Sequence, residues 1–179
     1  MKDWNLIVTI FQDGFRRALR ALRSLGPIER TAYHNVLTMS VEDPVKVLEV
    51  IELKTRESTA LYDAISRVSP AIYSFDFQSA EEFLQNARNV LVELSPKLAA
   101  RSFHVRFHRR GPRYDLGTQQ TEHFLNEIVL DATTRLGAPG RLSFTDPEAV
   151  ITIDTIDNRA GLALWTRDDL ARHPLLRPD

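Results

Sequence analysis

The order of apolar patterns constrains the fold of this chain more than any other feature of its sequence. Strand patterns and helix patterns alternate over residues 1–77. The expected strands lie at residues 5–11, 28–33, 36–41 and 71–77. The expected helices lie at residues 13–25 and from Asp43 to about residue 67, the second as one helix or a helix pair. The resulting order is βαββαβ.

This order is that of the ferredoxin-like split unit, in which two helices cover one face of a four-stranded sheet. Asp43 and Pro44 suit the start of the second helix, because an aspartate caps the free amides and proline is favoured in the first turn. We therefore expect residues 1–77 to form a ferredoxin-like domain.

A second domain is expected over residues 78–179. Ser79 and Glu82 form a capping-box pattern at the start of a helix that ends near Pro96. Strand, helix and three further strands follow at residues 102–109, 118–136, 141–144, 149–156 and 160–166. No long flexible linker separates the two domains, so the sequence predicts an α+β protein whose domains pack together.

The composition excludes several classes of protein. The 179 residues are 43% apolar and 26% charged, as in ordinary globular domains. The absence of cysteine excludes a disulfide scaffold and any thiolate nucleophile or metal ligand. No apolar run reaches the roughly 18 residues of a membrane helix, and the start lacks the apolar core of a signal peptide. We expect a soluble cytoplasmic protein without a membrane partner, and the sequence leaves its oligomeric state open.

Positive charge is densest around the strand expected at residues 102–109. No acidic residue lies between Glu93 and Asp115. The cations of this stretch are Lys97, Arg101, Arg106, Arg109, Arg110 and Arg113. Alternation along a strand predicts an apolar face and a polar face. The apolar face would hold Phe103, Val105 and Phe107, and the polar face His104, Arg106 and His108.

Binding of phosphate groups is the use that this pattern favours. Gly111 and Pro112 would turn the chain and hold the adjacent arginines as a rigid fork for phosphate oxygens. Tyr114 lies beside the fork and suits stacking on a base. Arg141 belongs to a second stretch without acids and would widen the patch. The predicted RNA contacts are Arg101, His104, Arg106, His108, Arg109, Arg110, Arg113, Tyr114 and Arg141.

The same segment resembles a known family. Residues 103–111, Phe-His-Val-Arg-Phe-His-Arg-Arg-Gly, are similar to the strand and basic turn of the THUMP domain, an RNA-binding module of tRNA and rRNA modification enzymes. Residues 144–164 are similar to the closing hairpin of that family. The resemblance covers about residues 79–179, and family members commonly carry a ferredoxin-like unit in front.

The resemblance implies RNA contact for Arg106, Arg109 and Arg110, whereas His104, Arg113 and Tyr114 are assigned from strand alternation and proximity. His108 departs from the family, which more often has lysine there. A histidine has an ordinary pKa of about 6.5, so this position lacks a permanent positive charge.

The resemblance also implies a function. Family members hold the single-stranded 3′ end and acceptor region of tRNA, while a catalytic domain modifies the RNA. This chain lacks nucleotide-binding and nucleophile motifs, and it ends at Asp179, soon after the expected hairpin. We therefore expect a non-catalytic tRNA-binding protein that serves a separate RNA-modification enzyme, as stand-alone members serve a tRNA cytidine acetyltransferase.

No cofactor or metal is expected. His104 and His108 lie four residues apart on the expected strand. Their separation would be about 13 Å, which is too far for both to bind one zinc ion.

Two other functions fit parts of the sequence. A ferredoxin-like unit can hydrolyse acyl phosphates, although the turn at residues 12–15 has one glycine and places Asp13 where an anion would bind. A protein assembly module would use Leu175, Leu176 and the sheet edges. Arg16, Arg20 and Arg23 share one face of the first expected helix, and a solvated face is the simpler interpretation of that pattern.

Overall fold

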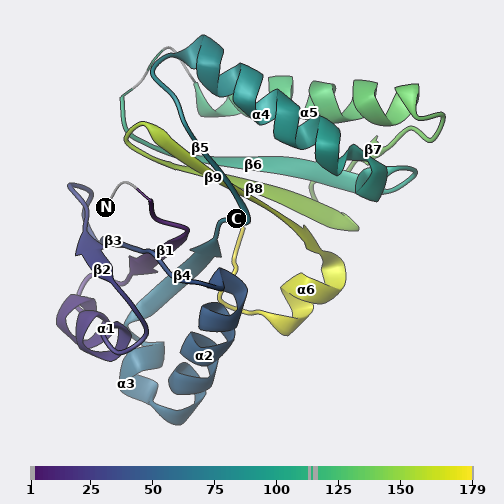
Figure 1. The fold of residues 1–179 in the computed structure, drawn as a ribbon. Coiled ribbons are helices and arrows are strands. Elements are labelled where there is room, and N and C mark those ends of the chain that lie inside the picture. Colours follow the sequence, from purple (N-terminus) through teal and green to yellow (C-terminus); the bar gives the residue numbers. More distant parts are fainter. Residues whose placement is uncertain (1–2, 113, 115–116, 179) are drawn as a thin grey trace. The chain divides into compact units, whose positions relative to one another are not determined.

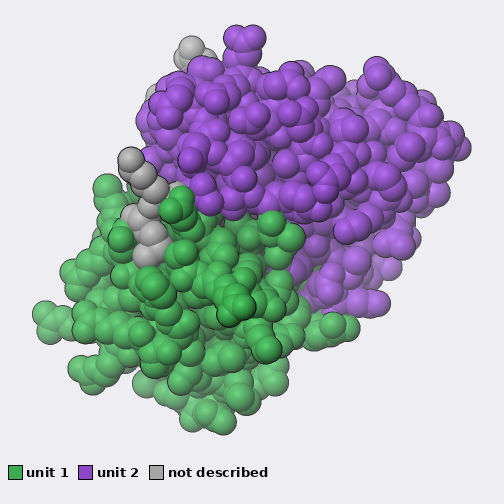
Figure 2. All heavy atoms as spheres, in the orientation of Figure 1, with its two compact units in different colours: residues 1–72, 170–177 green, residues 73–169, 178–179 purple. Residues whose placement is uncertain are grey.

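The computed structural model describes residues 3–112, 114 and 117–178. The chain forms two compact units (Figures 1 and 2). The first unit extends to Ile72 and includes Leu170–Arg177, and the second contains Tyr73–Asp169 and Pro178. These units differ from the expected domains of residues 1–77 and 78–179, because residues 73–77 belong to the second unit and the C-terminal segment to the first.

The first unit has the element order that the sequence predicts, with the second helix present as a helix pair that ends at Tyr62, before the expected residue 67. Its strands are β1 (Leu6–Ile10), β2 (Ile28–Arg30), β3 (Val36–Met39) and β4 (Ile65–Pro70). Its helices are α1 (Phe15–Leu22), α2 (Pro44–Glu57) and α3 (Thr59–Tyr62). The strands form an antiparallel sheet in the order β2-β3-β1-β4. Consecutive residues Leu6, Ile7 and Val8 of β1 are all buried, so both faces of the strand are covered, which explains its almost continuous apolar sequence.

Local sequence signals set the start of α2. The Asp43 carboxylate accepts hydrogen bonds from the amides of Val45 and Lys46 at 3.1 and 3.0 Å. Pro44 occupies the first turn, where its missing N–H costs no hydrogen bond. The prediction of a helix start at Asp43 and Pro44 is confirmed.

The strand predicted at residues 71–77 forms at Tyr73–Asp76, but its assignment as the last strand of this sheet is wrong. The last strand is β4, which pairs with β1 through Val68 opposite Val8. Residues 73–76 form β5 in the other sheet, where Phe75 packs against Phe83 with ring centroids 5.9 Å apart. The aromatic rings therefore draw this segment into the core of the second unit.

The second unit is a five-stranded sheet with two long helices on one face (Figure 1). Its strands are β5 (Tyr73–Asp76), β6 (Ser102–Arg110), β7 (Arg141–Leu142), β8 (Ala149–Ile156) and β9 (Arg159–Thr166), in the order β5-β9-β8-β6-β7. Its helices are α4 (Ala80–Leu94), the 3-10 helix η1 (Ser95–Leu98) and α5 (Thr118–Arg135), and α6 (Arg167–Arg172) follows β9. β6 runs parallel to β7 and β8, and the other neighbouring strands are antiparallel.

The helix predicted from Ser79 is also confirmed. The Ser79 hydroxyl accepts a hydrogen bond from the Glu82 amide at 3.1 Å, and the Glu82 carboxylate accepts one from the Gln78 amide at 2.7 Å. Within the described ranges, none of the helices combines the length and the apolar character needed to cross a membrane.

The C-terminal segment is part of the core of the first unit. Leu175 and Leu176 are buried, and the Val68 amide of β4 donates a hydrogen bond to the Leu175 carbonyl at 2.8 Å. His173 Nδ1 lies 2.9 Å from Glu52 Oε2, and both side chains are buried. The two leucines are therefore unavailable for the partner contact that an assembly module would need.

Candidate nucleic-acid interface

β6 carries most of the predicted RNA contacts, and β8 holds it along its length. The two strands pair in parallel from Phe103 opposite Ala149 to Arg110 opposite Ile156. Phe103, Val105 and Phe107 are buried in the core formed with α4 and α5. The predicted apolar face of this strand is confirmed, so alternate residues of β6 point away from the helices.

His104 lies on that second face but is not exposed. Its side chain is only 2% accessible, its Nδ1 lies 2.8 Å from the Ser143 carbonyl, and its ring packs against Phe144 at 5.5 Å between centroids. The expectation that His104 faces solvent is wrong, because the segment after β7 covers it.

Arg106 and Arg110 lie on the same face as His104, and each is close to a carboxylate. Arg106 Nη1 lies 3.9 Å from Glu122 Oε2, and Arg110 Nη1 lies 3.3 Å from Asp154 Oδ1. The side chains of Arg106 and Arg110 remain 30% and 20% exposed. Acidic residues therefore lie close to β6 in the folded protein although none lies close to it in the sequence. They come from α5 and β8.

Arg109 points to the opposite face of the strand from Arg110. Its Nη1 donates to the Gly111 carbonyl at 3.2 Å, and its Nε is buried without a hydrogen-bond partner in the described part of the chain. Arg113 lies outside the described residues. Of the three arginines in the predicted fork, Arg109, Arg110 and Arg113, the first two point to opposite sides of the strand, as neighbouring residues of a strand do.

The turn after β6 is held against the hairpin between β8 and β9. Gly111 has φ 151°, and a Cβ at this position would lie 2.8 Å from the Asp157 carbonyl oxygen. The Asp157 amide also donates to the Arg110 carbonyl at 2.8 Å. Only glycine fits here, because the backbone conformation and the close approach both exclude a side chain.

The two other predicted contacts near this turn are bound within the protein. His108 Nε2 lies 2.9 Å from the Pro178 carbonyl, and the His108 side chain is half-buried. The Tyr114 hydroxyl donates to Asn158 Oδ1 at 3.0 Å, and its ring packs edge-on against Phe77 at 6.0 Å. Tyr114 is therefore partly buried in the core and not presented as an open stacking surface.

Arg101 and Arg141 lie at the other end of β6 from the turn. Arg101 precedes the strand, and Arg141 begins β7 opposite Ser102. The nine residues of β6 separate the two ends by about 26 Å. The structure thus divides the predicted patch into a group at the turn, with Arg109 and Arg110, and a group at the strand start, with Arg101 and Arg141.

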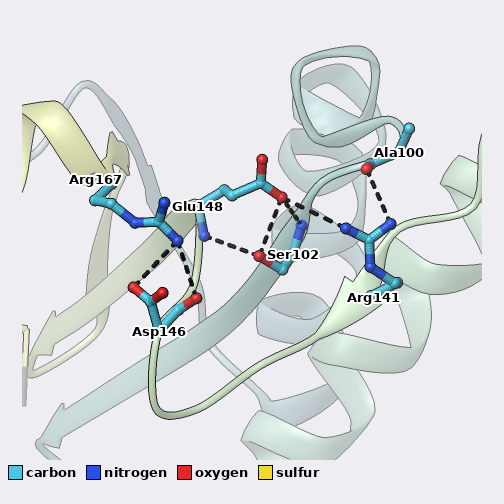
Figure 3. Close-up of polar contacts among 6 residues, drawn as sticks. All are labelled: Ala100, Ser102, Arg141, Asp146, Glu148 and Arg167. Atoms are coloured by element: carbon cyan, nitrogen blue, oxygen red, sulfur yellow. Dashed lines mark hydrogen bonds and ion pairs between the residues drawn. The ribbon is translucent and has the colours of Figure 1, made fainter.

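Glu148 organises the group at the strand start (Figure 3). Its Oε2 accepts hydrogen bonds from the Ser102 amide and hydroxyl at 2.7 and 3.1 Å, and lies 3.7 Å from Arg141 Nη2. Arg141 Nη1 also donates to the Ala100 carbonyl at 3.3 Å. Arg167 binds Asp146 nearby at 3.1 Å. Arg141 is 67% exposed despite its partners, whereas Arg101 is exposed and contacts no described carboxylate.

The hydrogen bonds from the Ser102 amide and hydroxyl hold the pKa of Glu148 below its ordinary value, and the charges of Arg141 and Arg167 add to this effect. A carboxylate whose pKa is lowered by folding stabilises the folded state above its unfolded pKa of about 4.3, and loses that contribution as the pH falls through the lower folded pKa.

We therefore expect Glu148→Gln to lower the free energy of unfolding at pH 7 and to flatten its decline below about pH 4.3. Urea unfolding of both proteins between neutral and acidic pH measures this difference. Parallel stability curves for the two proteins below pH 5 would contradict it.

In the described ranges no group of three histidine, aspartate or glutamate side chains is arranged to bind a metal ion.

The chain is similar in fold to several solved structures. No protein-family model and no curated protein matches the chain. The solved structures include PH1313 from Pyrococcus horikoshii Ot3, which is 14% identical, covers 89% of this chain and gives a TM-score of 0.61. TrmN from Thermus thermophilus is 15% identical, covers 90% and gives 0.58. A 4-thiouridine synthetase bound to RNA and ATP is 15% identical, covers 91% and gives 0.54. The chain spans 53%, 44% and 42% of these three proteins, so both of its units share the fold of about half of each.

Proposed function

We propose that this chain is an RNA-binding protein of RNA modification, with a ferredoxin-like first unit and a THUMP-like second unit. The observation that carries the proposal is the fold that 91% of the chain shares with an RNA-bound 4-thiouridine synthetase. The antiparallel strand order β2-β3-β1-β4 supports the ferredoxin-like assignment. The THUMP resemblance of residues 103–111 falls on β6 and its turn, where the arginines lie.

The ligand we assign is the acceptor stem and single-stranded 3′ end of tRNA. The chain would act without catalysing a reaction and would hold this end for a separate RNA-modification enzyme. A tRNA cytidine acetyltransferase is the partner that the THUMP resemblance implies. Such a division of labour needs only affinity and orientation from this chain, and contacts to phosphates supply both.

Arg106, Arg109 and Arg110 are the proposed phosphate contacts. A guanidinium group has several N–H donors in a planar arrangement, so a contact with one carboxylate orients it without using all of them. The pairing of Arg110 with Asp154 therefore supports a fixed position for its remaining donors. The turn at Gly111 is packed against the Asp157 backbone and hydrogen-bonded to it, which favours a fixed position of the site before binding.

Fluorescence anisotropy with labelled tRNA, measured over a series of salt concentrations, tests the proposal. The affinity of the wild-type protein should fall linearly on logarithmic axes as salt rises. The triple variant Arg106→Ala, Arg109→Ala and Arg110→Ala should bind at least about tenfold more weakly, with a salt slope lower by about one for each phosphate that the variant no longer neutralises.

Two controls accompany this experiment. A variant that removes the exposed cations Arg88, Lys97 and Arg172 has the same charge change and should bind like the wild type. Replacement of the three β6 arginines by lysine keeps the positive charge. This variant should recover part of the affinity that the alanine variant loses, whereas unfolding of the alanine variant would predict no such relation to charge. Failure of the wild type to bind tRNA, or equal binding by the alanine variant, would refute the proposal.

A further inference from the structure

The arginines of α1 differ from most of the described arginines of the second unit. Arg16, Arg17 and Arg20 are exposed on this helix, Arg23 follows it, and none of them pairs with a carboxylate in the described part of the chain. In the second unit a carboxylate lies within ion-pair distance of Arg106, Arg110, Arg135, Arg141, Arg159 and Arg167. Within the described residues, α1 and Arg23 therefore carry a close group of cations without internal carboxylate partners.

Two of these arginines line a hollow in the first unit. Arg17 and Arg20 of α1 and Lys54 of α2 line a depression of about 370 Å³. Among the described residues that line it, Glu57 is the only acidic one, and Ser58 contributes a hydroxyl group. Ala21, Ala60 and Leu61 add aliphatic side chains to the lining. The lining of the hollow thus combines a net positive charge with an aliphatic surface.

Arg16 and Arg17 gain nothing from the helix dipole, whereas Arg20 lies in the last turn, where a cation is favourable. The first turn of α1 contains Arg16 and Arg17 and no acidic residue, although cations are unfavourable at the positive end of a helix dipole. Arg17 makes one weak internal contact, from Nη2 to the Asp13 carbonyl at 3.4 Å. An anion from outside the chain would relieve the repulsion among Arg17, Arg20 and Lys54.

We propose that this hollow receives one phosphate group of the RNA backbone, with the attached ribose against its aliphatic side chains. The proposal rests on the RNA-binding function assigned above and adds a contact on the first unit. The volume falls within the range of about 300–1,000 Å³ that is usual for small-ligand sites, so it admits part of a nucleotide as well as an anion. Two guanidinium groups and an ammonium group are the donors that phosphate oxygens prefer.

The test compares the variant Arg17→Ala, Arg20→Ala and Lys54→Ala with the control that lacks Arg88, Lys97 and Arg172. Binding of labelled tRNA should weaken by about tenfold in the hollow variant, with a salt slope lower by about one, while the control binds like the wild type. The thermal unfolding midpoint should not fall, because none of the three side chains pairs with a carboxylate in the described residues and their removal relieves mutual repulsion.

Ethylation of tRNA phosphates gives a second readout. One phosphate should be found whose ethylation weakens binding to the wild type but not to the hollow variant. If this variant keeps full affinity while the β6 variant binds weakly, the inference is wrong and the RNA-binding function stands. If the wild type does not bind tRNA, the RNA-binding function itself fails. Equal weakening of the hollow variant and the control would mean a general charge effect, and would also overturn the inference.

Discussion

Replacement of Leu175 by alanine is expected to lower the free energy of unfolding of the first unit by about 2–5 kcal/mol. Leu175 is 2% exposed although it lies near the end of the chain. Its carbonyl accepts a hydrogen bond from Val68 of β4, and its amide donates to Glu52 at 3.2 Å. Removal of the side chain leaves a cavity and loosens the segment that carries these bonds. Urea unfolding, with hydrogen exchange of the β1 and β4 amides, measures the effect on this unit.

The matched control is Leu53→Ala on α2, where the leucine is 53% exposed. Its effect should stay within about 0.5 kcal/mol, as for most surface substitutions. Equal effects of the two substitutions, or unchanged exchange in β1 and β4 of the Leu175 variant, would contradict the docking of the C-terminal segment. The C-terminal segment also supplies His173, the buried partner of Glu52. Removal of the segment would leave the buried Glu52 carboxylate without that partner, which would destabilise the first unit further.

Replacement of Phe83 by alanine should destabilise the second unit by about 3–5 kcal/mol. Phe83 is fully buried, and its ring centroid lies 5.2 Å from that of Phe77 and 5.3 Å from that of Phe107. These rings join β6, α4 and the segment after β5, so one substitution opens the core behind the arginine-bearing strand. Urea unfolding, with hydrogen exchange of the β6 amides, reports this destabilisation.

Phe124→Ala on α5 is the control for that substitution, since Phe124 is 44% exposed. We expect its effect on unfolding to be within about 0.5 kcal/mol. The Phe83 variant keeps every cation, so its folded fraction should retain affinity for tRNA. A stability change below about 1 kcal/mol would mean that the aromatic cluster is not the centre of this core.

Much of the secondary structure follows from local sequence signals. The helix predicted at residues 118–136 is α5 at Thr118–Arg135, and the strands predicted at residues 102–109 and 149–156 are β6 and β8. Helix periodicity, strand alternation and capping residues act over a few neighbouring positions, so they can be read without knowledge of distant contacts.

The assignment of segments to sheets could not be read in this way. The sequence of residues 65–70 is short and has no clear period, and β4 forms because β1 offers a free edge for pairing. Residues 73–76 have a strand pattern that suits either sheet, and the packing of Phe75 and Phe77 with Phe83 decides between them. Strand partners are chosen by contacts between distant residues, which no local pattern encodes.

The sequence by itself determined that a cationic strand with one buried apolar face would end at a glycine turn, because strand alternation and the conformational freedom of glycine are local properties. Only the tertiary structure decided which of the cations have partners. Folding brought Glu122 and Asp154 to Arg106 and Arg110, and within the described residues it left the arginines of α1 without carboxylates. An electrostatic interaction depends on distance in space, and that distance is set by packing and not by position along the chain.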